Sequence, residues 1–368
     1  TRSFPLHYVD WDQPARNAFH VTEEFPVERT GSSETARPDL VLFVNGIPFA
    51  VIECKKPSED NPLKQAIEQQ IRNQKDEYIP RLFVTVQLLL GLATNQASYA
   101  TVGTSERFWS VWREDLNEDA LRALVNLSLD PATIARLFGD RDRRSQQHFE
   151  ALQEAGREVT EQDRVLYALC RPERLLEISR RFILFEGSEK KVARHQQYFC
   201  VQKAMDRVRQ RDAEGRRPGG VVWHTQGSGK SLTMVMLANA IADELEADGA
   251  KRVVLVTDRV DLDRQIEGAF HRSGLEPVRA RTGKHLGELL EGETTVITTV
   301  IDKFEALADA RSVRVESPDI FVLVDESHRG QYGQLHARMR RVLPNACFLG
   351  FTGTPVAGST TSSSESAK

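Results

Sequence analysis

The sequence predicts an α/β protein with two domains in series, a mixed-sheet domain followed by a domain built on a parallel sheet. The chain has 368 residues, which is more than a single hydrophobic core usually supports. Two β-rich runs on either side of residue 45 are joined by a short turn signal, which predicts antiparallel strands. Beyond residue 220, short apolar runs alternate with helical patterns, and this alternation indicates a parallel sheet covered on both faces.

The composition is that of an ordinary globular protein, with 40% apolar and 28% charged residues. The net charge is −4, so overall charge gives no reason to expect a nucleic-acid partner, and motifs must support any such claim. Two locally basic stretches, 141–144 and 203–217, are interpreted either as solvated helix faces or as tracks for phosphate groups.

The four cysteines lie far apart and form no Cys-x-x-Cys spacing. This argues against a zinc site and against a disulfide framework, so we expect a reducing cytoplasm. We expect no membrane association, because no apolar run approaches the length of a membrane span. No secretory leader is visible, although the first residue is Thr1 rather than Met.

The first domain is expected to occupy residues 1–185. The β-rich runs Asp39–Val44 and Pro48–Glu53 flank the turn pair Asn45-Gly46, which predicts two antiparallel strands. Further elements follow along the chain. They are a helix over 62–77, a strand within 82–92 and, from 114 to 208, a helical pattern that extends the domain into a junction.

The second domain is expected over 190–357, followed by a disordered Ser/Thr-rich tail at 358–368. An apolar helix over 232–242 follows its first strand. The predicted strands are 220–223, 252–257, 295–299, 320–324 and 347–351.

Asp39, Glu53 and Lys55 form the first candidate site. Glu53 and Lys55 point to the same face because side chains alternate along a strand, and the turn brings Asp39 near Glu53. Carboxylate oxygens suit a hard cation such as Mg2+, which would polarise a phosphodiester and help to form hydroxide from water. Lys55 would orient that water or stabilise the developing negative charge. An exposed hairpin with ordinary charges is the alternative.

The Pro-Asp and Glu-x-Lys pattern of these residues resembles the PD-(D/E)xK nuclease superfamily. Gln74 and Tyr78 fit a Gln-x-x-x-Tyr motif of its RecB-like branch, and the resemblance implies that they brace the metal site or the DNA backbone. Gln65, Gln69 and Gln70 lie on the same predicted helix, so which glutamine serves the site stays open.

The strongest motif runs from His224 to Ser231 and lies between an apolar strand and an apolar helix. Backbone amides of a glycine-rich turn at a helix N-terminus cradle phosphate oxygens, which predicts an ATP site. Lys230 would contact the β- and γ-phosphates, and the Ser231 hydroxyl would bind Mg2+. His224 stands where the usual pattern has Gly or Ala. The predicted ATP-binding residues of the loop are Thr225, Gln226, Gly227, Ser228, Gly229, Lys230 and Ser231.

Two later strand ends complete this prediction. One apolar strand ends in Asp325 and Glu326, which places Asp325 to hold Mg2+ and Glu326 to activate the attacking water. His328 is expected to be a coupling residue rather than a ligand. Thr352 and Thr354 follow another strand, and would hydrogen-bond toward the ATP site and sense its state.

Gln197 lies upstream of the loop and is predicted to read adenine. A glutamine amide can donate to N7 and accept from the exocyclic amine in one bidentate contact, as Asn and Gln do at adenine in nucleic acids. A helix-surface position is the alternative for Gln197.

These blocks resemble the motifs of superfamily 2 helicases and translocases, whose motor domains are RecA-like. The glycine-rich loop, Asp325–His328 and Thr352–Pro355 look like motifs I, II and III. In addition, 254–259 resembles motif Ia, and 297–304 resembles the segment before motif II.

Three longer sequence blocks resemble the motor/restriction subunit of type I restriction-modification enzymes. They are 223–234, 325–332 and 348–355. In those subunits the nuclease also precedes the motor, whereas type III restriction subunits have the reverse order. The resemblance implies ATP and Mg2+ as cofactors, and double-stranded DNA and the modification (methyltransferase) and specificity subunits as partners. It also implies that ATP-driven movement of duplex DNA is coupled to cleavage.

The chain stops just after motif III, before the second RecA-like domain that completes the ATP site in such motors. We therefore expect this chain to bind nucleotide weakly and to hydrolyse it poorly. Two alternatives remain from the residues, namely a stand-alone DNA repair helicase-nuclease and a nuclease-dead ATP-dependent DNA-binding scaffold. A small-molecule P-loop kinase is disfavoured, because it has no reason to carry the blocks at 325–328 and 352–355 together.

Overall fold

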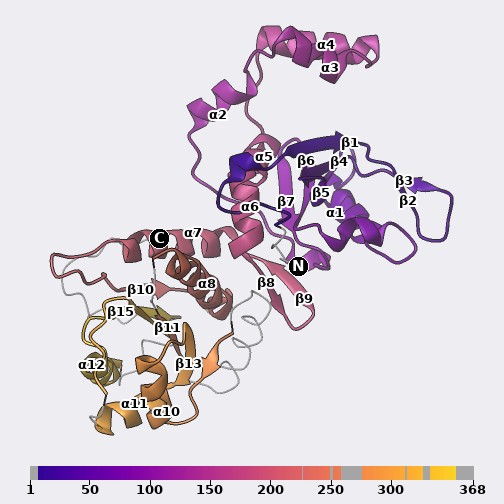
Figure 1. Cartoon of the computed structure of the whole chain (residues 1–368). Coiled ribbons are helices and arrows are strands. Elements are labelled where there is room, and N and C mark those ends of the chain that lie inside the picture. The colour runs from indigo at the N-terminus through magenta and orange to yellow at the C-terminus, as the bar shows by residue number, and fades with distance from the viewer. Residues whose placement is uncertain are drawn as a thin grey trace, which may run out of the picture. The chain divides into compact units, whose positions relative to one another are not determined.

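The computed structural model describes residues 7–225, 227–248, 252–257, 276–310, 313–325 and 332–353. The chain divides into two compact units, Thr1–Arg180 and Arg181–Lys368, and each is described separately below (Figure 1). No helix in these ranges is both long and apolar enough to cross a membrane.

The first unit is built on a five-stranded mixed sheet with the order β1-β4-β5-β6-β7. Only the central pair β5–β6 is parallel, and its neighbours pair antiparallel, so the predicted mixed sheet is confirmed. Helix α1 (Pro62–Asn73) packs on β5 and β6, where Gly91 leaves room for Ala66 because a Cβ at Gly91 would lie 3.3 Å from that side chain. The strands are β1 (Phe19–Glu23), β4 (Leu40–Val44), β5 (Ile47–Cys54), β6 (Leu88–Ala93) and β7 (Gln96–Ala100), beside a small hairpin of β2 (Val27–Glu28) and β3 (Thr35–Ala36).

The turn between β4 and β5 has the conformation that its residue pair predicts. Asn45 and Gly46 have φ angles of 51° and 81°, and positive φ at both central residues is typical of the two-residue turn that matches the twist of antiparallel strands. The Asn45 side chain also accepts a hydrogen bond from the Ala18 amide at 2.7 Å. The turn places Val44 opposite Ile47, and a β-bulge between Leu42 and Phe43 then shifts the register by one residue, so that Leu40 lies opposite Ile52.

Three predicted elements differ from the structure. The helix predicted to reach residue 77 ends at Asn73, because the Asn73 carbonyl accepts a hydrogen bond from the amide of buried Ile79 at 3.1 Å. The strand predicted within 82–92 occupies only the later part of that range and begins at Leu88, since 80–84 forms a 3-10 turn that buries Leu82 and Phe83.

The third difference lies in the region that was predicted to be helical up to residue 208. That prediction is wrong for β8 (Ile183–Glu186) and β9 (Glu189–Val192), which pair as an antiparallel hairpin. Gly187, with a φ angle of 60°, makes the turn between them.

The rest of this region is helical. Its helices are α2 (Glu118–Val125), α3 (Pro131–Phe138), α4 (Arg143–Ala155), α5 (Glu161–Cys170) and α6 (Pro172–Arg181). Neither α3 nor α4 contains a buried residue. Their order comes from local contacts, since Asp130 and Asp142 cap the two N-termini and the rings of Phe138 and Phe149 stack 3.8 Å apart.

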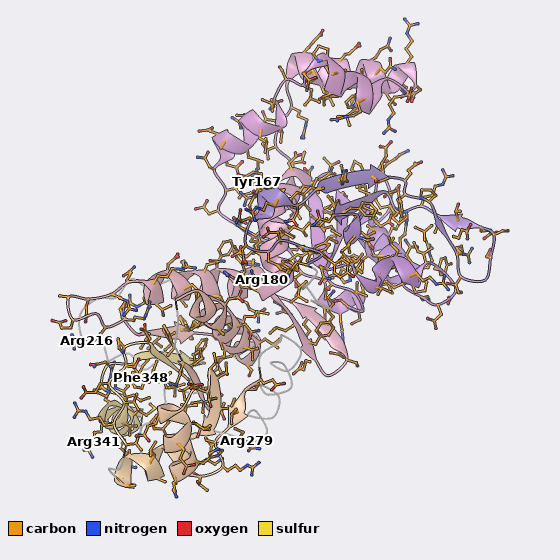
Figure 2. The ribbon with its side chains drawn as sticks, in the orientation of Figure 1. Tyr167, Arg180, Arg216, Arg279, Arg341 and Phe348 are labelled. Carbon is orange, nitrogen blue, oxygen red and sulfur yellow. The ribbon has the colours of Figure 1, made fainter. Side chains whose placement is uncertain are left out.

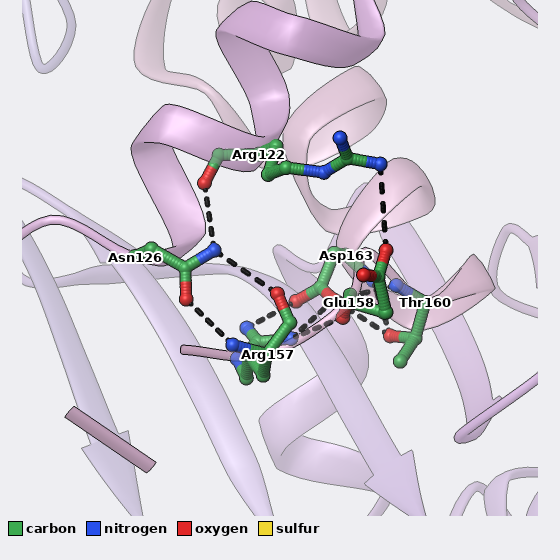
Figure 3. A network of polar contacts seen from close by, with 6 residues as sticks. All are labelled: Arg122, Asn126, Arg157, Glu158, Thr160 and Asp163. Carbon is green, nitrogen blue, oxygen red and sulfur yellow. Dashed lines mark hydrogen bonds and ion pairs between the residues drawn. The ribbon is translucent and has the colours of Figure 1, made fainter. Parts of the chain in front are cut away.

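A polar network closes the base of this α3–α4 segment (Figure 3). Asn126, which precedes the segment, and Arg157, which follows it, exchange two hydrogen bonds of 2.7 and 3.0 Å. Arg157 also forms a bidentate pair with Asp163 at 2.6 and 2.7 Å. Burial alone would raise the pKa of Asp163, but the hydrogen bonds from Arg157 and Thr160 hold it below its ordinary value. The residues that precede and follow the α3–α4 segment are therefore hydrogen-bonded to each other next to helix α5.

The second unit is built on a sheet whose described strands follow the order β10-β15-β14-β11-β13-β12, and every pair is parallel. The parallel sheet and its five predicted strands are confirmed. The strands are β10 (Gly220–Trp223), β11 (Arg252–Thr257), β12 (Val278–Arg279), β13 (Val296–Val300), β14 (Ile320–Val324) and β15 (Cys347–Thr352).

Helices cover both faces of this sheet (Figure 1). One face forms a core cluster with α10–α12 that includes Val254, Val322 and Phe304, while α8 contacts β11 and packs against α7. The predicted helix over 232–242 lies within α8. The helices are α7 (His195–Arg209), α8 (Lys230–Asp248), α10 (Gly283–Glu291), α11 (Ile301–Ala310) and α12 (Tyr332–Val342).

The base of the α3–α4 segment can be tested with Asn126→Ala. We expect amide exchange at Arg157 to accelerate by about tenfold, because the amide loses its acceptor and a hydrogen bond contributes about 1 kcal/mol net. Hydrogen exchange measured residue by residue checks this. Gln147→Ala, on the exposed side of α4, is the matched control, and equal protection of Arg157 in both variants would show that the network does not close the segment.

Candidate functional site

The first candidate site lies where β4 begins and β5 ends. Leu40 pairs with Ile52, which places Asp39 beside Glu53, close enough for the charge of Asp39 to act on the Glu53 carboxyl. The amide of Cys54 donates to Asp39 Oδ2 at 2.6 Å, which fixes the Asp39 carboxyl on this strand. The predicted convergence of the two carboxyl groups is therefore present in the structure.

Glu53 is fully buried, and this environment changes its acidity. Burial and, next, the negative charge of Asp39 raise the pKa of Glu53 to about 8, although Lys55 and Arg72 oppose the shift. The direction of this shift is the one expected for two carboxyl groups at close range in a buried place.

This carboxyl pair fits a divalent cation. Mg2+ prefers oxygen ligands and is commonly bound by one or two carboxylates together with waters and phosphate oxygens, which Asp39 and Glu53 can supply. In the described ranges, no three His, Cys, Asp or Glu side chains gather as a larger metal-binding group. The chemistry of the two donors, rather than a full protein cage, is what supports Mg2+ here.

Two amides on α1 contact this pair. Gln69 donates from Nε2 to Glu53 Oε2 at 2.6 Å and accepts from Lys55 Nζ at Oε1 over 2.7 Å. Asn73 donates from Nδ2 to Glu53 Oε1 at 3.2 Å. Among the glutamines that the sequence left open, Gln69 thus contacts the site, and Asn73 was missed. The signal for both was their separation by one helical turn, which puts them on one face of a helix.

Gln74 and Tyr78 lie just after α1, and their contacts are with residues outside the carboxyl pair. Gln74 accepts a hydrogen bond from the Gly103 amide at 2.8 Å, and the Tyr78 ring lies under the guanidinium groups of Arg29 and Arg72, at 4.6 and 5.6 Å. These contacts hold surrounding loops against α1. A role of Gln74 and Tyr78 in bracing a metal or a DNA backbone stays a prediction.

The second candidate site lies at the carboxyl ends of β10 and β14. The loop after β10 leads into α8, and Gly227 and Gly229 in it have φ angles of 76° and 86°, a region that only glycine adopts readily. Lys230 begins α8, and its Nζ lies 2.9 Å from Oδ1 of Asp325, which follows β14. Because parallel strands end at the same edge of a sheet, the loop lysine and this buried acid meet.

His224 braces the loop. Its ring is 7% exposed, with Nδ1 2.6 Å from Ser228 Oγ and Nε2 3.0 Å from Thr233 Oγ1. Ser228 Oγ donates to the Thr225 carbonyl at 2.5 Å, which leaves Ser228 to accept from His224 Nδ1. The Thr233 hydroxyl lies between two acceptors, His224 Nε2 at 3.0 Å and the Gly229 carbonyl at 3.2 Å. An imidazole in place of the usual small residue therefore links the loop tip to the first turn of α8.

Strand β15, which pairs with β10, also ends beside this site. Trp223 pairs with Thr352 across β10 and β15, and the amide of His224 donates to the Thr352 carbonyl at 2.9 Å. Thr352 is buried next to the start of the loop, and its role as a sensor of the ATP site stays a prediction. The predicted residues Gln226, Glu326, His328 and Thr354 lie outside the described residues.

Gln197 is buried on α7 and contacts the loop backbone. Its Nε2 donates to the Gly229 carbonyl at 3.1 Å, and its Oε1 accepts from the Arg194 amide at 2.9 Å. A Cβ at position 229 would lie 2.6 Å from Gln197 Nε2, so Gly229 is required for this contact as well. An amide has one further donor and one further acceptor position, and adenine recognition by Gln197 stays a prediction.

The basic stretch 203–217 is largely neutralised by its own surroundings. Arg216 (Figure 2) pairs with Asp212 and Glu214, while Arg211 and Arg217 both pair with Asp319. These arginines hold the segment between α7 and β10. The interpretation of this stretch as a phosphate track receives no support from their contacts.

Comparisons with known proteins match both parts of the chain. Residues 2–111 match the family described as "Type I restriction enzyme R protein N terminus", and residues 196–367 match the SWI2/SNF2 ATPase family. The chain is 33% identical to the HindI type I restriction enzyme endonuclease subunit of Haemophilus influenzae and 31% identical to the MjaIXP endonuclease subunit of Methanocaldococcus jannaschii, with 95% of the chain aligned in each case.

The chain spans 32% of the length of each of these two relatives. Among solved structures, the SWI2/SNF2 ATPase core of Sulfolobus solfataricus in complex with dsDNA covers 44% of this chain and 31% of its own length, at 10% identity and a TM-score of 0.31.

The buried ring of His224 predicts a pH dependence of folding. Burial, and next the charge of Lys230, lower the pKa of His224 below its ordinary value, so the unfolded chain binds a proton more readily than the folded chain does. The contribution of His224 to stability is then present above the unfolded pKa of about 6.5 and is lost as the pH falls through it.

We therefore expect the unfolding midpoint of the wild-type chain to fall more between about pH 7.5 and about pH 5.5 than that of His224→Asn. Thermal unfolding at both pH values measures the difference, and His148→Asn, at an exposed position on α4, is the control. Parallel pH profiles for wild type and His224→Asn would contradict the prediction.

Proposed function

We propose that this chain, which is similar to the endonuclease subunits of type I restriction enzymes and spans about a third of the two relatives above, joins a magnesium-dependent DNA nuclease to the first ATPase domain of a DNA motor. The first unit is the nuclease, and the second unit binds ATP. The boundaries proposed from the sequence are 1–185 and 190–357.

The nuclease proposal rests on the arrangement of three side chains. The carboxyl groups of Asp39 and Glu53 lie beside each other, and Gln69 holds Lys55 next to Glu53. When bound there, Mg2+ supplies polarisation of the scissile phosphate and makes a water more acidic. Asp39 and Glu53 would hold the cation, and Lys55 would stabilise the negative charge that develops on the phosphate.

In the second unit, the proposal rests on Lys230 and Asp325, which pair with each other in the absence of nucleotide. ATP would give Lys230 its phosphate oxygens, while Asp325 and the Ser231 hydroxyl would hold the Mg2+ that accompanies the nucleotide. Glu326 is proposed to activate the attacking water. His328, Thr352 and Thr354 are proposed to couple the state of the nucleotide to the rest of the motor.

For the whole protein we propose double-stranded DNA as substrate and the modification and specificity subunits as partners. These partners would select unmethylated sites, because a motor that moves along DNA must contact mainly phosphates and cannot read sequence at each step. ATP hydrolysis would move the duplex, and the nuclease would cut it away from the recognition site.

The test is restriction of unmodified phage by cells that carry the full-length protein with its partner subunits. We expect Lys55→Ala and Lys230→Ala each to abolish restriction, with cleavage by purified Lys55→Ala complex reduced at least about a hundredfold. The same Lys55→Ala complex should still hydrolyse ATP on unmethylated DNA, because its motor is intact.

Lys75→Ala, which removes an exposed lysine just after α1, is the control and should restrict normally. Normal restriction by Lys55→Ala would show that the carboxyl pair belongs to an ordinary hairpin. Normal restriction by Asp39→Ala as well would support an ATP-dependent scaffold without nuclease activity in this unit.

A further inference from the structure

His224 begins the glycine-rich loop, at a position where the usual pattern has a glycine. A glycine offers no side-chain hydrogen bond, whereas an imidazole carries two ring nitrogens on different sides of the ring. The ring is 7% exposed, and buried polar atoms of this kind need partners. Both nitrogens have one, in Ser228 and Thr233. The histidine therefore adds contacts that the usual residue cannot make.

The Nδ1 atom of His224 contacts the tip of the loop. It lies 2.6 Å from Ser228 Oγ, which donates in turn to the Thr225 carbonyl at 2.5 Å. The Ser228 amide donates to the same carbonyl at 3.1 Å. Hydrogen bonds in such a chain strengthen one another. The ring therefore helps to hold Ser228 against Thr225 by contacts within the protein alone.

The Nε2 atom of His224 contacts the first turn of α8. It lies 3.0 Å from Oγ1 of Thr233, which is fully buried. The Thr233 amide donates to the Gly229 carbonyl at 3.1 Å, and its hydroxyl lies 3.2 Å from that carbonyl. The first amides of a helix have no acceptor within the helix and can bind phosphate oxygens. One ring thus joins the loop tip to the helix end that would receive a phosphate.

We propose that His224 is a positioning residue that holds the phosphate-binding loop in shape for the nucleotide. The inference rests on the proposed ATP site and adds to it a residue that acts through Ser228 and Thr233 instead of touching the nucleotide. A loop that is already ordered loses less conformational freedom when it binds a ligand. The contribution of His224 is therefore to nucleotide affinity, and a small residue at this position weakens binding here although it is usual in other such loops.

The experiment measures the affinity of the fluorescent analogue mant-ATP, with Mg2+, for the full-length protein and its partner subunits. The part of the signal that Lys230→Ala removes is assigned to the glycine-rich loop. We expect His224→Ala to raise the Kd of this part about 20-fold, because it removes the contacts to Ser228 and Thr233 and each hydrogen bond contributes a factor of about five. His285→Ala is the matched control and should bind as wild type does, since the His285 ring accepts from the Arg281 amide on a different helix.

A conservative variant separates positioning from a loss of folding. Asn can place its amide nitrogen near the position of His224 Nδ1 and donate to Ser228, but it has no counterpart of Nε2. We therefore expect His224→Asn to raise the Kd only about 5-fold. In a Ser228→Ala background, His224→Asn and His224→Ala should bind equally, because the acceptor that distinguishes them is gone.

Steady-state ATP hydrolysis by the same complex gives a second measurement. We expect His224→Ala to raise KM for ATP while kcat at saturating ATP stays within about twofold, since a contact that acts equally on bound substrate and transition state changes KM alone. A fall in kcat with unchanged KM would contradict a role in holding the loop for binding.

The outcomes distinguish the two levels of the proposal. If wild type shows no Lys230-dependent binding of mant-ATP, the proposed ATP site is overturned, and the positioning role with it. If that binding is present and His224→Ala binds as His285→Ala does, the ATP site stands and the role of His224 is overturned. The role is also overturned if His224→Asn binds no better than His224→Ala while Ser228 is intact.

Discussion

The pairing of β4 with β5 is the constraint on which the first site depends. The two-residue turn at Asn45-Gly46 and the β-bulge between Leu42 and Phe43 set the register, and the hydrogen bond from the Cys54 amide to Asp39 holds one acid on the strand that carries the other. A slip of one residue would turn Glu53 to the opposite face of the sheet. Burying two carboxyl groups together is unfavourable when both are charged, and burial and the charge of Asp39 raise the pKa of Glu53. On the proposed function, a divalent cation would relieve this repulsion.

The charges of the second site are arranged differently. Lys230 and Asp325 carry opposite charges and pair directly. On the proposed function, phosphate would become the partner of Lys230 and Mg2+ that of Asp325, because either ligand alone would leave one member of the pair without its counter-ion.

Local patterns predicted the elements whose geometry is local. Strand alternation and the Asn45-Gly46 turn predicted that Asp39 would come near Glu53, although the β-bulge that sets their register was not predicted. Apolar runs predicted the parallel strands. The glutamine of α1 could not be chosen, because that choice depends on how the helix is rotated over the sheet, which Gln70 and the space at Gly91 determine through long-range contacts. The β8–β9 hairpin was missed because apolar spacing cannot distinguish short strands from helices.

Each unit has a glutamine beside its candidate site, and the physical reason for a glutamine is the same in both. Gln69 touches Glu53 and Lys55, and Gln197 touches the Gly229 carbonyl of the glycine-rich loop. Both come from a neighbouring helix and both are neutral. A cationic side chain would compete with the metal or occupy the phosphate site, and an acidic one would bind the metal itself or repel phosphate. An amide can donate and accept at once without altering the charge of the site, so it can orient ligands and reactive groups while the balance between protein and ligand charges stays unchanged.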